Sequence, residues 1–349
     1  IDDEKRENEG DLIISTTDSS AKNINFMAKY GRGLICLALD SVQAKRLNLS
    51  LMSPINQSRN KTAFTISIEA KKGITTGISA KDRAKTIKIA SKKNVNKKDI
   101  VSPGHVFPII AKDGGVLVRA GHTEASVDIS KLAKKNNSAV ICEIMNEDGT
   151  MARRDDLEKF AKKHQLKIGT IADLIHYRLV TEKTTQCINE RTVTTHYGEF
   201  ILKTYLDNAR NEKHFALVMG DVSTDEPALV RVHINRSARD ILALESGGKF
   251  KSWSFHSALE RVAKEGRGAV VLVYHSETAE DVDNNIEMIV NPGIGGAQSA
   301  SDVVYQQVGT GSQILMDLGV HKMRLMSAPF KFSAISGFDL EVVEYVNCD

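Results

Sequence analysis

The sequence is poor in cysteine, in net charge and in long apolar runs. Its four cysteines, Cys36, Cys142, Cys187 and Cys348, are far apart and form no C-x-x-C pair, which argues against a zinc ribbon or a disulfide scaffold. A net charge of +3 over 349 residues does not indicate a nucleic-acid or membrane partner. No apolar run approaches the roughly 18 residues that a membrane span needs, and no signal peptide is visible. We therefore expect a cytoplasmic protein.

The composition is that of an ordinary globular protein, with 41% hydrophobic and 26% charged residues. A chain of this length predicts about two domains. The polar stretch at 181–192 is the expected linker, between a first domain at 1–180 and a second at 193–349. The chain opens inside a charged motif and without methionine, which is compatible with further residues before Ile1.

The first half mixes predicted strands and helices without a regular alternation, which favours an α+β fold with mixed layers. Short apolar or alternating runs predict strands, and apolar residues at helical spacing predict helices, one of them with Ser79 as its N-cap. The expected strands are 12–16, 33–39, 62–68 and AVICEIM at 139–145, and the expected helices are 21–30, 79–91, 155–164 and 170–179.

The second half shows the same two patterns. Strands are expected at HFALVMGDV, ALVRVHI, AVVLVYH and HKMRLMS, helices at 255–265 and within 303–318, and a loop at 291–302.

Six carboxylates stand within the first eleven residues, three of them (Glu7, Glu9 and Asp11) at alternate positions. Like charges this close repel one another unless a cation or a substrate hydroxyl compensates them. Hard divalent ions take oxygen ligands and usually keep several waters. The run therefore predicts a metal and polyol site on a loop, and a solvated acidic turn is the alternative.

Three further patterns carry polar chemistry. RAGHTEA places Arg119, which can bind a phosphate in bidentate fashion, near His122, a potential metal ligand, around Gly121, which lets the backbone approach a ligand. PGHVFP places His105 between turn residues near a strand end, and CEIMNEDGT places Glu143 on a strand; either could move protons. Each residue alone also fits a structural role: a histidine in a glycine-rich loop, a salt-bridged glutamate, and Cys36 and Cys142 as buried packing.

Together these motifs closely resemble those of 3,4-dihydroxy-2-butanone 4-phosphate synthase, an enzyme of riboflavin biosynthesis. The resemblance covers about residues 1–178, in the order DDEKRENEGDL, YGRGLICL, TTGISAKDR, PGHVFP, RAGHTEASVD and CEIMNEDGTMAR. It implies a lyase that converts ribulose 5-phosphate to 3,4-dihydroxy-2-butanone 4-phosphate and formate with Mg²⁺ or Mn²⁺. It also implies a homodimer with active sites at the subunit interface.

Carried over residue by residue, the resemblance makes Glu7 and His122 the metal ligands, and His105 and Glu143 the residues needed for catalysis. The implied substrate contacts are Arg6, Glu7, Asp11, Arg119, Ala120, Gly121, His122, Thr123 and Glu143. Arg119 would hold the phosphate, with Thr76 and Ser79 as helpers. One departure is the segment MSPINQSRNKTAF, where Pro54 replaces a glutamate and Lys61 a glycine, so loop closure and turnover rate are in doubt more than reaction type.

From about residue 193 the chain resembles GTP cyclohydrolase II, an α/β domain, in YGEF, HFALVMGDV, LVRVH, EGRG and QILMDLGVHKMRLMS. The functional positions of that family are changed. Its three zinc cysteines fall on Arg236, Gly247 and Lys249, its catalytic Asp and Arg on Val304 and Gln306, and its TNNP segment reads Ser327-Ala328-Pro329.

We therefore expect no zinc and no cyclohydrolase activity. The second domain would then serve in dimerisation, in stabilising the first domain, or in binding a nucleotide or partner. Two alternatives stay open. One is a bifunctional enzyme with an altered cyclohydrolase centre, for instance built on His233, His256 and His275. The other is a binding protein in which both halves are non-catalytic.

Overall fold

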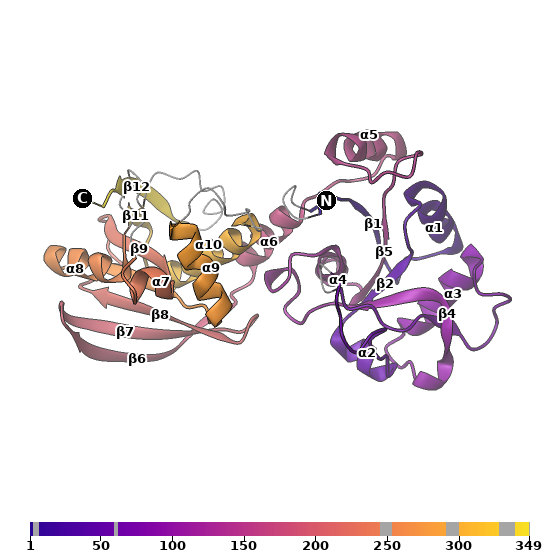
Figure 1. The fold of residues 1–349 in the computed structure, drawn as a ribbon, viewed down its shortest axis with the longest axis horizontal. Coiled ribbons are helices and arrows are strands. Elements are labelled where there is room, and N and C mark those ends of the chain that lie inside the picture. Colours follow the sequence, from indigo (N-terminus) through magenta and orange to yellow (C-terminus); the bar gives the residue numbers. More distant parts are fainter. Residues whose placement is uncertain (3–6, 59–61, 245–252, 291–299, 328–338, 349) are drawn as a thin grey trace. The chain divides into compact units, whose positions relative to one another are not determined.

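The structure is a computed structural model that describes residues 1–2, 7–58, 62–244, 253–290, 300–327 and 339–348; of residues 288 and 300–308 only the backbone is described. The chain forms two compact units, Ile1–Ile175 and His176–Asp349 (Figure 1). None of the helices in these ranges is both long and apolar enough to cross a membrane.

The first unit is built on a five-stranded mixed sheet in the order β1-β5-β2-β4-β3. Strands β2 and β4 run parallel, and the other neighbours are antiparallel. The strands are β1 (Asp11–Ser15), β2 (Cys36–Leu39), β3 (Ile68–Ala70), β4 (Ile100–Ile110) and β5 (Ser138–Glu143).

Helices lie on both faces of this sheet (Figure 1). Successive side chains of a strand point to opposite faces, so each strand packs against both layers of helices. Leu12, Leu37 and Val140 belong to a core cluster with residues of α1, α3 and α5. On the other face, Ala38 packs with Val127 of α4. The helices are α1 (Ala21–Phe26), α2 (Ser41–Arg46), α3 (Ala80–Ala90), α4 (His122–Leu132), α5 (Arg154–His164) and α6 (Ile171–Thr181), with the short helices η1 (Met27–Gly31), η2 (Lys97–Asp99) and η3 (Gly115–Leu117).

Most elements expected in this unit are confirmed, including the helix at 79–91 with Ser79 as its N-cap. The helix at 21–30 is split into α1 and the π-helical turn η1. The strand at 62–68 is wrong, because Phe64 and Thr65 form only isolated bridges and the ladder begins at Ile68. His105 lies within β4 rather than near a strand end. Strand β4 is long because β3 pairs with its first part and β2 with its second.

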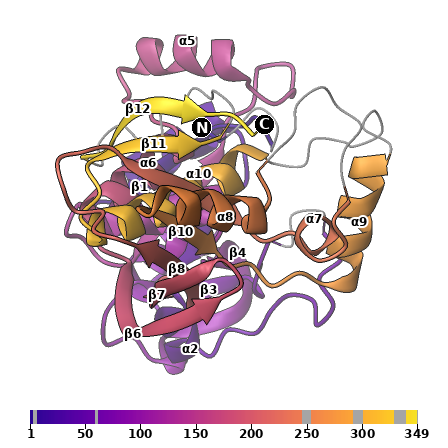
Figure 2. The same cartoon turned by 90° about the vertical axis from the view of Figure 1, so that its left-hand side faces the viewer.

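The second unit has a seven-stranded sheet in the order β12-β11-β9-β10-β8-β7-β6. Figure 2 shows its two edge strands, β12 near the top and β6 near the bottom. Helix α10 packs on one face of this sheet, in the core cluster that contains Tyr205. Helix α8 packs on the other face, in the core cluster that contains Phe200. The strands are β6 (Thr185–Thr195), β7 (Gly198–Asp207), β8 (Glu212–Met219), β9 (Ala228–Ile234), β10 (Gly268–Val273), β11 (Lys322–Met326) and β12 (Glu341–Val346), and the helices are α7 (Ser237–Asp240), α8 (Phe255–Glu265), α9 (Ala279–Val290) and α10 (Ala300–Asp317).

The polar stretch expected to be a linker is for the most part a strand, since residues 185–192 belong to β6. Strand β6 stands at the edge of the sheet and pairs only with β7. Its side chains are mostly exposed, so its composition is that of a solvated edge strand. The loop expected at 291–302 lies outside the described residues up to Ser299, and α10 begins at Ala300.

Candidate active site and metal centre

The acidic N-terminal segment and the beginning of α4 meet at one edge of the first sheet. Asp11 opens β1, Glu143 ends β5, and the two are directly paired in the antiparallel ladder. His122 is the first residue of α4, which packs on the same strands. The fold therefore places two motifs that lie more than 100 residues apart in the sequence next to each other.

The imidazole of His122 stands among carboxylates. Its Nδ1 lies 3.6 Å from Oε2 of Glu7 and 3.9 Å from Oδ1 of Asp11. Asp2, Glu7 and His122 each offer a ligand atom within 4.8 Å of the other two, and no other such group of His, Cys, Asp or Glu occurs in the described ranges. The Asp2 carboxylate also accepts hydrogen bonds from the backbone N–H groups of Glu7 and Glu9, at 3.2 and 2.8 Å, so it shapes the loop that carries Glu7.

These donors suit a hard divalent cation. His122 is only 8% exposed, and its Nε2 is buried without a hydrogen-bond partner. Oxygen ligands suit Mg²⁺, and Mn²⁺ prefers a similar set. A cation would also offset the repulsion between Glu7 and Asp2. The structure thus brings together the two expected metal ligands, Glu7 and His122, and adds Asp2 as a third donor that the sequence prediction had not assigned.

Burial dominates the electrostatics of this cluster. It raises the pKa of Asp11, although His122 works against that rise. Burial opposes the charge of His122, but Asp11 and Glu7 together raise the pKa of this histidine above its ordinary value. The pKa of Glu143 is raised first by burial and second by Asp11. Carboxyl groups whose pKa values move toward neutrality are suited to proton transfer.

The Glu143 carboxylate is held by the segment that leads into β2. Its Oε2 accepts a hydrogen bond of 2.8 Å from the backbone N–H of Leu34. Gly33 lies so close that a Cβ there would stand 2.5 Å from the Glu143 carbonyl oxygen and 2.6 Å from Oε2. The neighbouring Cys142 is buried, which raises its pKa to about 12, and burial also raises the pKa of Cys36. Both thiols are core packing rather than nucleophiles.

Arg119 is anchored to α4. Its Nη1 donates to Oε2 of Glu124 at 2.6 Å, and Oε1 of Glu124 accepts from the backbone N–H of Lys112 at 2.9 Å. A Cβ on Gly121 would lie 2.4 Å from the guanidinium and 2.7 Å from the Glu124 carboxylate. Gly121 therefore leaves room for this ion pair, and the expectation that it also lets a ligand come close stays a prediction.

The other expected substrate contacts divide into two groups. Ala120 and Thr123 flank the Gly121–His122 pair and are buried. Arg6 lies outside the described residues, as does Lys61 of the departing loop.

The two expected phosphate helpers differ from each other. The hydroxyl of Ser79 accepts a hydrogen bond of 3.1 Å from the backbone N–H of Asp82, so it caps α3. Asp82 in turn accepts from the hydroxyl of Thr75 at 2.7 Å and from the N–H of Gly77 at 3.2 Å. Thr76 is exposed between these two residues. The loop is therefore held by its own contacts.

His105 reaches the same face of the sheet from β4. Cys36 is paired with both Phe107 and Ile141, and these three residues pack in one cluster on a single face of the sheet. His105 is two residues before Phe107, and Glu143 is two residues after Ile141. Because residues two apart share a face, His105 faces the side on which α4 and the carboxylates lie.

The described contacts of His105 are made with Glu69 of β3 and not with the metal-ligand cluster. Nδ1 of the imidazole is bonded to Oε1 of Glu69. The side chain of His105 is 45% exposed and that of Glu69 is 15% exposed. No motif marks Glu69, which follows an alternating stretch and precedes Lys71 and Lys72, whereas Asp2 is part of a conspicuous acidic run.

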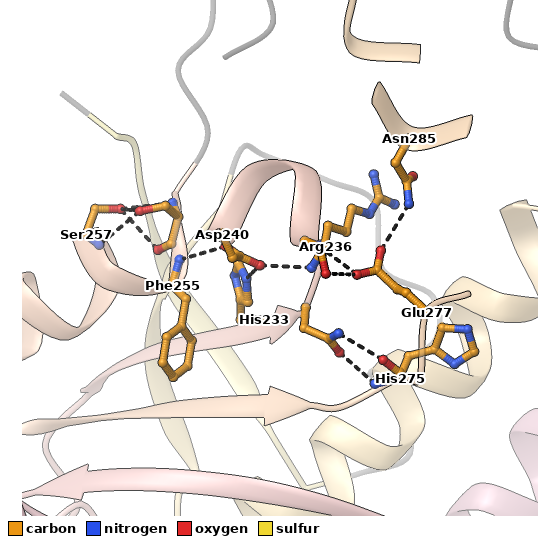
Figure 3. Close-up of polar contacts among 11 residues, drawn as sticks. His233, Arg236, Asp240, Phe255, Ser257, His275, Glu277 and Asn285 are labelled. Carbon is orange, nitrogen blue, oxygen red and sulfur yellow. Dashed lines mark hydrogen bonds and ion pairs between the residues drawn. The ribbon is translucent and has the colours of Figure 1, made fainter. Parts of the chain in front are cut away.

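In the second unit, Arg236, which the resemblance to GTP cyclohydrolase II matches to the first zinc cysteine of that family, is built into a hydrogen-bonded network (Figure 3). Arg236 is the N-cap of α7, and its backbone N–H donates to Oδ2 of Asp240 at 2.9 Å. The same oxygen is 2.9 Å from Nε2 of the buried His233, and the other carboxylate oxygen accepts from the N–H of Phe255 at 3.4 Å. Burial works against the charge of Asp240, but these bonds lower its pKa.

A second set of contacts closes the network. Oε2 of Glu277 accepts from the backbone N–H and the hydroxyl of Ser237, both at 2.7 Å, and Oε1 accepts from Asn285 at 3.1 Å. His275 donates its backbone N–H to Asn235 at 2.6 Å. His256 contacts the ring of Tyr197 instead. The described part of the unit therefore does not gather its histidines into a metal site.

The two cysteines of this unit lie at opposite edges of the sheet and do not form a common metal site. Cys187 is on β6 at one edge of the sheet and packs against the α10 side. Cys348 follows β12 at the other edge and packs against the α8 side. The remaining family positions are described less fully: Gly247, Lys249, Ala328 and Pro329 lie outside the described residues, and for Val304 and Gln306 only the backbone, in α10, is described.

Residues 1–177 match the family model of 3,4-dihydroxy-2-butanone 4-phosphate synthase, and residues 185–347 match that of GTP cyclohydrolase II. A 3,4-dihydroxy-2-butanone 4-phosphate synthase of Pseudomonas aeruginosa is 49% identical over 346 residues, which is 99% of this chain and 93% of that protein. The riboflavin biosynthesis protein RibBA of Aquifex aeolicus is 45% identical over 362 residues, 99% of this chain and 87% of that protein.

Two solved structures are similar as well. A two-domain 3,4-dihydroxy-2-butanone 4-phosphate synthase from A. baumannii, RibBX, superposes with a TM-score of 0.85 at 45% identity and covers 100% of this chain and 95% of its own. A 3,4-dihydroxy-2-butanone 4-phosphate synthase in complex with two magnesium ions has a TM-score of 0.50 at 38% identity, over 52% of this chain and 90% of its own.

Proposed function

The chain belongs to the 3,4-dihydroxy-2-butanone 4-phosphate synthase family, and from that premise we propose that the cluster of Glu7, His122, Asp11 and Glu143 is its active site. The chain carries this synthase activity of riboflavin biosynthesis and depends on Mg²⁺. The substrate is ribulose 5-phosphate, and the products are the four-carbon ketone phosphate and formate. Together the two products contain all the atoms of the substrate, so no co-reactant is needed.

Glu7 and His122 would hold the cation, with Asp2 within reach. A divalent cation bound there acts as a Lewis acid toward neighbouring oxygens of the sugar. The observation that carries the assignment is the buried imidazole of His122, whose Nδ1 lies 3.6 Å from Oε2 of Glu7 and 3.9 Å from Oδ1 of Asp11, within reach of a common ion with Asp2. Mg²⁺ and Mn²⁺ both suit such donors.

Proton transfer falls to the residues beside this cluster. Glu143 is oriented by the N–H of Leu34, and burial raises its pKa above the ordinary value, which suits it to take up and release protons. Arg119 is oriented by Glu124 and would bind the phosphate, so that remote binding energy positions the reacting carbons. His105 would act from the other side of the substrate.

The test is an assay of the purified chain with ribulose 5-phosphate. We expect formate release with Mg²⁺ or Mn²⁺, loss of release after EDTA treatment, and recovery when the metal is restored. If no formate forms under any of these metal conditions, the assignment fails.

We also propose that the chain works as a homodimer with the active site at the subunit interface. Three apolar side chains near the site are exposed: Leu34 (41%), Val118 (38%) and Ile129 (44%). Exposed apolar groups that cluster around a functional site indicate a surface covered by another chain.

Subunit mixing tests this proposal. Light scattering should give twice the chain mass, and a mixture of inactive His105→Ala and Glu143→Ala chains should regain part of the activity if the two residues act across the interface. A monomer with full activity would refute the dimer, and a dimer without recovery would place both residues in one chain.

For the second unit we propose that it has lost the cyclohydrolase reaction and binds no zinc, and that it serves as a folded partner of the first unit. The Asp240 network around Arg236 and the separation of Cys187 from Cys348 support this. The four free cysteines are also compatible with the reducing conditions of a cytoplasmic location.

The experiment is a paired assay with metal analysis of the same sample. We expect turnover of ribulose 5-phosphate, no formate or pyrophosphate from GTP, and no stoichiometric zinc. Release of formate or pyrophosphate from GTP, together with bound zinc, would instead support an altered cyclohydrolase centre.

A further inference from the structure

His105 is not an isolated imidazole on β4. Its Nδ1 is bonded to Oε1 of Glu69 on the neighbouring strand β3. An ionised carboxylate only accepts hydrogen bonds, so the ring nitrogen that faces it carries the proton. The other ring nitrogen, Nε2, then keeps its lone pair on a side chain that is 45% exposed.

Two glycines make room for the Glu69 carboxylate. A Cβ on Gly77 would lie 1.5 Å from Oε1 of Glu69 and 2.8 Å from Nδ1 of His105, and a Cβ on Gly104 would lie 2.4 Å from Cγ of Glu69. Gly77 also has a φ of +90°, a conformation that glycine adopts freely. A side chain at either position would displace Glu69 from the imidazole.

The β3–β4 ladder is irregular at the same place. Ile68 is paired with Val106, whereas Glu69 is paired with Val101, so the register shifts between two consecutive residues. Irregularities of this kind re-aim a side chain next to active sites. Ile68 stays in the core at 0% exposure, while Glu69 turns toward His105.

The loop over the pair is fixed from α3. Asp82 is 4% exposed and accepts hydrogen bonds from the hydroxyl of Thr75 and the backbone N–H of Gly77. The described contacts therefore place the Glu69 carboxylate against the imidazole, whereas the Asp82 carboxylate is bonded to the loop. The bond from the N–H of Gly77 to Asp82 holds this glycine beside the Glu69–His105 pair, where it leaves space for both side chains.

We propose that Glu69 is a positioning residue that keeps His105 in the Nδ1–H tautomer, so that Nε2 is the atom that takes up and returns a proton during turnover. A proton taken from the sugar phosphate at Nε2 gives an imidazolium whose other N–H remains on Glu69, and its release restores the neutral ring. The proposal rests on the function proposed above, since it requires that His105 takes part in the synthase reaction.

The tautomer can be read directly by ¹⁵N NMR of the histidine side chains in the full chain. The chain has ten histidines, and the signal lost in His105→Ala identifies the one of interest. In the wild-type chain we expect a protonated Nδ1 and an unprotonated Nε2. In Glu69→Ala we expect a shift toward the Nε2–H tautomer and a fall in kcat of about 10²-fold, within the range that a positioned acid–base group contributes, with KM changed little.

Glu69→Gln separates charge from geometry. Its amide oxygen can still accept from Nδ1, so the tautomer should persist and kcat should stay well above that of Glu69→Ala. Glu158→Gln, which removes an exposed carboxylate paired with Arg154 on α5, is the matched control and should change neither readout.

The outcomes distinguish the two proposals. If His105→Ala keeps full activity, the role proposed for His105 fails. If His105→Ala is inactive but Glu69→Ala changes neither the tautomer nor kcat, the positioning role of Glu69 fails alone. Gln has nearly the shape of Glu, so Glu69→Gln should fold even where Glu69→Ala does not, and a shift to the Nε2–H tautomer in that variant would contradict the proposal.

Discussion

Asp11 and Glu143 are directly opposed at the end of the β1–β5 ladder, with both side chains on the side of the sheet that α4 covers. Like charges directly across a ladder are destabilising, and burial with mutual repulsion raises the pKa of Glu143. A fold selected for stability alone would not place two carboxylates there. The pair is explained if a cation and a substrate share the site.

This arrangement predicts opposite effects on activity and stability. Glu143→Ala should lower turnover by at least about 10²-fold, since it removes a positioned acid–base group. The variant should be at least as stable as the wild-type chain, because the repulsion with Asp11 is gone. Formate release and thermal unfolding measured on one preparation check both. A turnover rate close to the wild-type value would contradict the catalytic role.

Gly33 offers a second way to disturb Glu143 without touching its carboxylate. Gly33→Ala would place a methyl group 2.5 Å from the Glu143 carbonyl oxygen and 2.6 Å from Oε2, so the Leu34 N–H bond must break or the segment must move. We expect a fall in kcat of about tenfold or more for displacement by such a clash. Gly169→Ala is the control, because no atom lies within 4 Å of a Cβ there, and it should have wild-type activity.

The metal ligands can be ranked by affinity rather than by activity alone. Binding of Mn²⁺, followed by electron paramagnetic resonance, should weaken in Glu7→Gln and in His122→Ala by about 10- to 100-fold or more, since each removes a donor. Asp2→Asn should weaken binding less if Asp2 mainly holds the loop through its bonds to the N–H groups of Glu7 and Glu9. If all three variants bound Mn²⁺ as tightly as the wild-type chain, the metal site would have to lie elsewhere.

Local patterns predicted much of this fold and the resemblance predicted most of the candidate site. The apolar runs LIIST and AVICEIM predicted β1 and β5, and Ser79 predicted the start of α3. Nothing in the spacing of RENEGD and RAGHTEA placed Glu7 beside His122, because that contact depends on which strands α4 covers. The resemblance supplied it.

The failures have physical causes of two kinds. Polar edge strands look like linkers, as β6 did, because one face is solvated and no core constrains its composition. Side chains aimed by a shift in strand register, as Glu69 is, cannot be read from alternation, since the shift breaks the period of two on which alternation depends.

The Asp240 network predicts a pH-dependent stability of the second unit. The folded-state pKa of Asp240 is lowered by its bonds to His233 and Arg236, although burial works against this. Such a carboxylate stabilises the fold at pH values above its unfolded-state pKa of about 4, and the contribution is lost as the pH falls through the lower folded-state value. Asp240→Asn should therefore cost about 1–3 kcal/mol at neutral pH, as expected when a charged acceptor in a buried network is lost.

The single tryptophan makes this measurable within the unit concerned. Trp253 donates its Nε1–H to the carbonyl of Val346 and is 8% exposed, so its fluorescence reports unfolding of the α8 side of the sheet. Denaturant unfolding at several pH values should show the difference between wild type and Asp240→Asn shrinking below about pH 4. Asp283→Asn on an exposed face of α9 is the control. A difference that stays constant down to pH 3 would mean that the Asp240 charge contributes nothing to the stability of the unit.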